Sequence, residues 1–229
     1  MVAMLLPTAS TDHSWPYASL VCPRETRCGY PIPHKKALPT FNEAVHNMEG
    51  TRMPSIPYQP KDLAEPRDLV AAIRARRGGT LLNLDRMLLH SPPLAQGWNG
   101  YLRAVRTELT VSPKLRELAI CVVALLNRAD YEYHHHAPEF LREGGTTAQL
   151  DALGHVANAN VNVTVFDASE RAVLALAVEM TQKVQVSAAT MASIRTALPD
   201  DRHVVEIVAV IATYNMVSRF LVALGVEPE

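Results

Sequence analysis

Residues 112–126 read SPKLRELAICVVALL, and this stretch decides the fold class that the sequence predicts. The Ser-Pro pair at its start is typical of a helix beginning, because proline at the first helical position gives up only an amide that the helix leaves unpaired. All nine residues from 118 to 126 are apolar, so we expect this helix to be buried on most of its sides. An acid such as Glu117 is costly in these surroundings unless it is hydrogen-bonded, protonated or part of a site.

Helix signals recur on both sides of this segment. Capping residues or prolines precede stretches with apolar residues at three- to four-residue spacing, and Gly or Pro follows several of them. Only a weak alternating pattern at 160–166 competes with helix, so the sequence predicts an all-α fold of about eight helices. The predicted helices lie at 66–77, from 92 past 105, at 113–126, at 131–142 capped by Asp130, at 147–156 capped by Thr147, from 167 or 169 to 180, at 187–198 and at 200–224.

The N-terminal part of the chain has a different composition. Ten of the sixteen prolines fall within residues 1–66, and proline interrupts both helices and central strands. We therefore predict an irregular arm over residues 1–60 and a helical domain over 61–229. The arm contains Cys22 and Cys28, as free thiols or as a pair across a short loop, and Met53 is an alternative start.

Composition excludes several classes of protein. The 22 Lys and Arg residues are balanced by 23 Asp and Glu residues, so no basic excess exists for binding a nucleic acid backbone. The longest apolar run has nine residues, short of the ~18 that a membrane span needs, and the start of the chain lacks the basic region of a secretory signal. Three cysteines are too few for a disulfide scaffold. We expect a cytoplasmic protein that binds neither nucleic acid nor membrane.

A spaced motif follows the apolar helix. The motif has the form Glu117-x11-Ala129-x2-Glu132-x3-His136. It resembles the signature of the carboxymuconolactone decarboxylase/AhpD-like family, whose redox branch has Glu-x11-Cys-x2-Cys-x3-His. Residues 112–120, the Gly144 that follows His136, and the stretch YNMVSRF at 214–220 resemble the same family. The resemblance covers roughly residues 61–229 and implies an AhpD-like helical domain that forms a homo-oligomer and binds a small molecule near subunit contacts.

The redox activity of the family does not carry over to this chain. Disulfide reductase or peroxidase turnover needs an attacking thiolate and a resolving thiol, but Ala129 and Glu132 occupy the two cysteine positions. Cys121 lies elsewhere, in an apolar helix that would raise its pKa, and we interpret it as a small buried hydrophobic residue.

The decarboxylase branch of the family implies a site without a cofactor. Loss of CO₂ from a carboxylactone requires a positioned acid or base, and a histidine titrates in the suitable range. We predict that His136 is the general acid/base and that Glu132, four residues earlier on the same helix face, and Glu117 assist it. The function predicted is therefore a cofactor-independent lyase that acts on a small carboxylated or lactone-type substrate.

Three residues near the C-terminus are predicted to bind this substrate. Arg219 lies on an otherwise apolar helix and can grip a carboxylate with two hydrogen bonds. Tyr214 and Asn215 can donate a hydrogen bond to a carbonyl oxygen. Each of the three also has an ordinary structural interpretation, as a subunit salt bridge or as a helix contact.

The run of histidines at 134–136 leaves a metal site as an alternative. Consecutive helix residues lie about 100° apart, so the three cannot converge on one ion. Only Glu132 with His136, or His135 with Glu139, has the four-residue spacing of helical zinc sites. A metal-dependent enzyme and a non-catalytic oligomeric binding module therefore stay open as alternatives, while no metal is our expectation.

Overall fold

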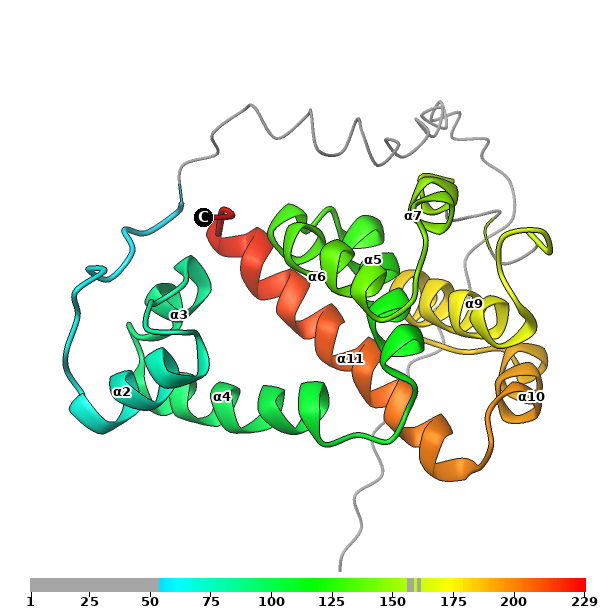
Figure 1. Cartoon of the computed structure of the whole chain (residues 1–229), viewed down its shortest axis with the longest axis horizontal. Coiled ribbons are helices and arrows are strands. Elements are labelled where there is room, and N and C mark those ends of the chain that lie inside the picture. The colour runs from blue at the N-terminus through cyan, green and yellow to red at the C-terminus, as the bar shows by residue number, and fades with distance from the viewer. Residues whose placement is uncertain (1–53, 156–158, 160–161) are drawn as a thin grey trace, which may run out of the picture. The chain divides into compact units, whose positions relative to one another are not determined.

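The computed structural model describes residues 54–155, 159 and 162–229. These residues are helical, with turns and loops but no strand, so the predicted all-α class is confirmed. Nine helices lie within them, against about eight predicted. They are α2 (Arg67–Arg76), α3 (Asn83–Leu88), α4 (Pro92–Thr107), α5 (Pro113–Asn127), α6 (Asp130–Arg142), α7 (Thr147–Leu153), α9 (Ala168–Lys183), α10 (Ala188–Ala197) and α11 (Asp201–Leu224) (Figure 1).

Residues 1–53 lie outside the described part of the chain, so the predicted arm with Cys22 and Cys28 stays a prediction. Residues 54–60, the described end of the predicted arm, form no helix. The backbone amide of Ser55 donates a hydrogen bond to the carbonyl oxygen of Leu224 over 2.8 Å. The hydroxyl of Tyr58 accepts a hydrogen bond of 2.9 Å from the amide of residue 227. Residues 55–58 therefore contact the C-terminal end of the helical domain.

Three of the later helices begin at polar caps, close to the starts that the sequence predicts. The side-chain oxygens of Asp167, Ser187 and Asp200 each accept a hydrogen bond from the amide three residues later, at 2.8, 3.2 and 3.0 Å. Each cap satisfies an amide that has no partner within its helix. The last helix ends at Gly225, whose φ of 63° is the left-handed conformation that glycine favours.

Two predicted caps are wrong by one residue. Ala129, and not Asp130, precedes the first residue of α6. Thr146, and not Thr147, caps α7: its hydroxyl accepts from the amide of Gln149 over 3.2 Å, and Gln149 accepts in return from the Thr146 amide over 3.1 Å. This reciprocal pair needs Gln three residues after the cap, which only Thr146 provides. The predicted ends of α7 and α9 differ from the structure by three residues each.

The buried core is centred on α5, as its apolar run predicts. Residues 118–124 are at most 1% exposed. This helix packs against α6, α9 and α11, while α11 also contacts α4. Figure 1 shows α11, in orange and red, running past α5 and α6 toward the C-terminus. The arrangement brings the start of α5, the first turns of α6 and the second half of α11 close together.

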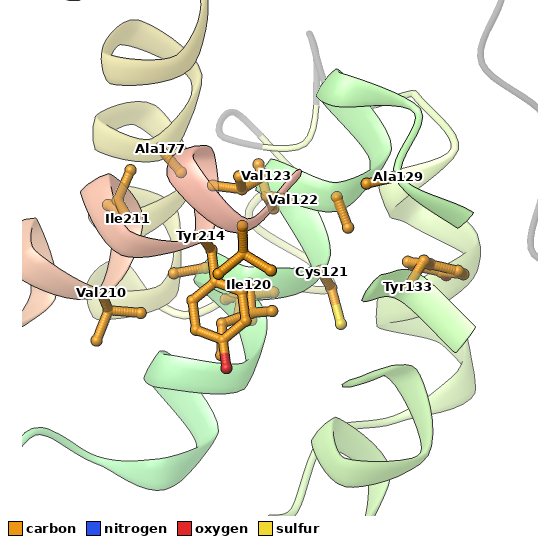
Figure 2. Packing of buried hydrophobic residues seen from close by; sticks show 14 of the residues in the cluster. Ile120, Cys121, Val122, Val123, Ala129, Tyr133, Ala177, Val210, Ile211 and Tyr214 are labelled. Carbon is orange, nitrogen blue, oxygen red and sulfur yellow. The ribbon is translucent and has the colours of Figure 1, made fainter. Parts of the chain in front are cut away.

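Cys121 belongs to this core, as the sequence predicts. Figure 2 shows it on α5 among buried neighbours that include Ile120 and Tyr133. Its side chain is fully buried, and burial raises the pKa of the thiol well above its usual range. A thiol held neutral in this way is a poor nucleophile at physiological pH.

One helix of the described residues, α11, is long and apolar enough to cross a membrane by length and composition. Half of its most apolar window is buried inside the helical domain. Among its buried residues Ile207, Val210 and Leu221 are at most 2% exposed. The burial of this helix follows from its contacts with α5, α6 and α9.

Candidate active site

Glu117 and His136, which the sequence predicts as site residues, are hydrogen-bonded to each other. Nδ1 of His136 on α6 lies 2.6 Å from Oε2 of Glu117 on α5. Both side chains are buried, at 8% and 4% exposure. Within the described residues this is the one hydrogen bond of the His136 ring, so the bond to Glu117 fixes the orientation of the imidazole.

The protonation of this pair follows from its surroundings. Burial alone would raise the pKa of Glu117, but hydrogen bonds from His136 and from Nε of Arg116, at 3.1 Å, outweigh it and lower that pKa. Burial lowers the pKa of His136, and the attraction of Glu117 opposes this only in part. An ionised Glu117 accepts the proton of Nδ1, so neutral His136 keeps a lone pair on Nε2. That atom can act as a base.

Glu132, the third predicted catalytic residue, has a raised pKa, whereas the pKa of Glu117 is lowered. It lies on α6 and is 1% exposed. Its two carboxyl oxygens lie 3.0 and 3.1 Å from the hydroxyl of Ser218 on α11, which donates to them. Burial raises the pKa of Glu132 well above its usual range, and neither Ser218 nor the charge of Arg106 offsets this. Burial therefore favours the protonated form of the Glu132 carboxyl group.

Tyr214, a predicted substrate-binding residue, lies against the same group. Its ring meets the His136 ring edge to face, with centroids 4.9 Å apart and planes at 85°. Its hydroxyl accepts a hydrogen bond of 2.8 Å from Nε of Arg106 on α4. Figure 2 labels Tyr214 among the residues of the buried cluster. Burial raises the pKa of the Tyr214 hydroxyl to about 12.

A cavity of about 290 Å³ connects these groups. Side chains from α4, α5, α6 and α11 line it, and among them are Arg106, Glu117, Glu132, His136 and Tyr214. Leucines and a valine from α3 and α11 form an apolar part of the wall. The volume is at the lower end of the roughly 300–1,000 Å³ of small-molecule sites, so the cavity suits a compact ligand.

The structure does not bring Arg219 and Asn215 into this cavity. Arg219 is exposed, and its Nη1 donates to the backbone and side-chain oxygens of Asn215 over 2.7 and 2.9 Å. The side-chain amide of Asn215 donates to Thr181 over 2.9 Å, and its oxygen accepts from Asn127 over 3.1 Å. Neither residue lines the cavity. Their predicted substrate contacts stay predictions that this geometry does not support.

The histidine run at 134–136 lies on α6, which continues through Pro138 to its end. No group of three or more His, Cys, Asp or Glu side chains that could hold a metal ion lies within the described residues. His135 and Glu139, one of the two pairs with the four-residue spacing of a helical zinc site, bind separate partners. Nε2 of His135 lies 2.9 Å from Oε2 of Glu229, and Glu139 pairs with Arg142.

The cavity also contains residues that the sequence did not single out. Three arginines line it, namely Arg77, Arg106 and Arg116. Tyr131 lines it too, and its buried hydroxyl lies near the backbone of Leu84 without a hydrogen bond of good geometry. The sequence around an arginine on an amphipathic helix does not show whether that arginine belongs to a site. The hydrogen bond between Arg106 and Tyr214, for example, joins residues far apart in the sequence and is found only in the folded structure.

Comparison with known proteins agrees with the family resemblance. The model of the carboxymuconolactone decarboxylase family matches residues 92–179, a range that contains Glu117, Glu132 and His136. No match was found among the curated proteins.

Solved structures share the fold at low sequence identity. A peroxidase-related protein from Silicibacter sp. TM1040 has a TM-score of 0.61 at 20% identity, over 78% of this chain and 90% of its own. An alkylhydroperoxidase AhpD core protein from Ralstonia eutropha JMP134 has 0.58 at 17%, over 77% and 92%. The debrominase Bmp8, in complex with 2,3,4-tribromopyrrole, has 0.63 at 17%, over 76% and 92%. At these identities the likeness establishes an AhpD-like fold and no particular reaction.

Proposed function

We propose that the protein is a cofactor-independent lyase that decarboxylates a small carboxylated or lactone-type substrate, because residues 92–179 match the model of the carboxymuconolactone decarboxylase family. The observation that carries the proposal is a base and an acid in one cavity: His136, oriented by Glu117 over 2.6 Å, and the protonated Glu132. Pairs of titratable groups whose environments move their pKa values apart are typical of acid–base sites.

The reaction balances with these groups alone. The bond between the carboxylate carbon and the ring carbon breaks, CO₂ leaves, and the electron pair moves into the conjugated carbonyl of the lactone. The resulting enolate takes up one proton, so that R–CO₂⁻ and H⁺ give R–H and CO₂. Glu132 holds a proton for this step, and His136 can relay a proton from solvent through Nε2.

Replacement of His136 tests the assignment. We expect His136→Ala to lower turnover by about 10²–10⁴-fold, the usual contribution of a general acid or base. The assay is CO₂ release from 4-carboxymuconolactone and from a panel of related acids, with circular dichroism to check folding. His90→Ala is the matched control, because His90 lies outside the cavity and bonds to Gln59 and to the carbonyl of Pro57.

Each outcome of this experiment has a clear meaning. Unchanged turnover in a folded His136→Ala variant would overturn the assignment. Saturable binding without turnover of any substrate in the wild type would support the alternative of a non-catalytic binding module. The proposal includes the predicted homo-oligomer and cytoplasmic location. Light scattering tests the first, and a monomer in solution would contradict it.

A further inference from the structure

Two of the three cavity arginines already have an acidic partner. Nε of Arg77 lies 3.1 Å from Oδ2 of Asp85, and Nε of Arg116 lies 3.1 Å from Oε1 of Glu117. Pairing of this kind compensates a guanidinium that is shielded from water. These two arginines therefore stabilise the wall of the cavity and carry little free positive charge into it.

Arg106 is different. Its Nε donates to the neutral hydroxyl of Tyr214 over 2.8 Å, and its Cζ lies 5.8 Å from the centroid of the Tyr214 ring. Among the described residues no carboxylate lies within 4.0 Å of its guanidinium nitrogens, and no hydrogen bond joins its Nη1 or Nη2 to another residue. Tyr214 thus fixes the plane of the guanidinium while its terminal nitrogens remain available.

Within the described residues, none of the nearby acids forms an ion pair with Arg106. Glu117 is engaged by Arg116 and His136, and Glu132 holds its proton because burial raises its pKa. Glu139, also in the cavity wall, pairs with Arg142. Among the described residues Arg106 is therefore the one arginine of the cavity wall without a carboxylate partner, and an anionic ligand can supply that partner through two parallel hydrogen bonds.

We propose that Arg106, oriented by Tyr214, binds a carboxylate of the ligand through Nη1 and Nη2, in place of Arg219. We further infer, on the basis of the proposed function, that this carboxylate stays on the substrate during the reaction. An arginine paired with the departing carboxylate would stabilise the ground state, because the negative charge leaves that group in the transition state. A substrate with one retained and one departing carboxylate satisfies both requirements.

The first test compares two probes on the unmodified protein. Benzoate and benzamide have the same shape and number of heavy atoms but differ in charge, and both are compact enough for a small cavity. We expect benzoate to bind about 10- to 100-fold more tightly, the range for a hydrogen bond to a charged group. Isothermal titration calorimetry at pH 7 and low salt measures both affinities.

The second test assigns the effect to a residue. Arg106→Gln should remove the preference for benzoate, while Arg106→Lys should keep part of it because it retains the charge but lacks the planar fork. Arg103→Gln is the matched control, since Arg103 lies on the same helix and pairs with Glu108 at the surface. Arg219→Gln should bind benzoate as the wild type does.

Two results would overturn the proposal. One is equal binding of benzoate and benzamide to the wild type, including no binding of either. The other is unchanged benzoate affinity in a folded Arg106→Gln or a loss of affinity in Arg219→Gln. Because neither probe is turned over, these results are independent of catalysis: a protein that binds benzoate through Arg106 but shows no decarboxylation would fail only the proposed function.

Discussion

Two buried carboxyl groups lie along α11 and differ in their hydrogen-bond partners. Glu206 is part of the first half of α11, and Glu132 of α6 is hydrogen-bonded to the second half. In the first half, Glu206 accepts hydrogen bonds from the amide and hydroxyl of Thr110, from the amide of Val111 and from Nε of Arg202, all at 2.7–2.9 Å. In the second half, the hydroxyl of Ser218 is the one donor to Glu132 of α6 among the described residues. The residues are 7% and 1% exposed, but Glu206 lies close to the surface of the domain and Glu132 lies deep inside it.

Depth of burial and the number of donors together explain why the two pKa values move in opposite directions. Burial would raise the pKa of Glu206, but its hydrogen bonds outweigh that effect and lower the pKa. Burial raises the pKa of Glu132 because one hydroxyl cannot compensate it. A buried acid with a full set of donors fixes a loop to a helix, whereas a buried acid with one donor keeps its proton and has it available for chemistry.

The largest contrast is expected from the same substitution at both positions. Glu206→Gln should lower the free energy of unfolding by about 1–3 kcal/mol, because buried donors lose a charged acceptor. Glu132→Gln should leave this free energy unchanged or raise it, because an amide replaces a carboxyl that was already neutral. Urea denaturation at pH 7 measures both. Equal losses at the two positions would contradict the comparison.

The effect of Glu132→Gln should also depend on pH. The folded-state pKa of Glu132 is raised, so above the unfolded value of about 4.5 the unfolded state loses a proton that the folded state keeps. Wild-type stability therefore falls as pH rises toward the folded pKa, by at most about 1.4 kcal/mol per pH unit. The variant lacks this penalty, so its advantage should be larger at pH 7 than at pH 5.

Glu206 provides the control for that dependence. Its folded-state pKa is lowered, so its contribution is present above the unfolded pKa and disappears as pH falls through the folded pKa. The cost of Glu206→Gln should therefore shrink at low pH, opposite in direction to the change at Glu132. A pH-independent difference between wild type and Glu132→Gln would show that Glu132 is ionised in the folded protein.

Most of the fold could be predicted from the sequence because its helix signals are local. The apolar run of α5 and the caps Asp167, Ser187 and Asp200 need no knowledge of the rest of the chain. The short helix α3 was missed, since Leu82 precedes it in place of a polar cap and six residues show too little periodicity. Its acid, Asp85, is held by arginines from the end of α2.

The site was predictable only where spacing along one or two helices places it. Glu132 and His136 share a face of α6, and the geometry joins Glu117 to His136. Arg219 does not line the cavity: an arginine on an apolar helix suggests a site, but the sequence pattern does not indicate which face of the helix meets the cavity. Arg106 meets it through Tyr214, 108 positions away in the chain.

The smallest effect is expected from Ser218→Ala, which removes the one donor of Glu132. Because the Ser218 hydrogen bond lowers the pKa of Glu132, that pKa should rise further, and the free energy of unfolding should fall by about 0.5–1.5 kcal/mol. Carboxyl ¹³C chemical shifts of labelled glutamates follow the titration directly. Ser169→Ala is the control, since the hydroxyl of Ser169 donates to the backbone carbonyl of Ala197 and not to a carboxyl group. If Ser218→Ala leaves the titration of Glu132 unchanged, burial alone keeps this carboxyl protonated, and the number of donors does not distinguish the two halves of α11.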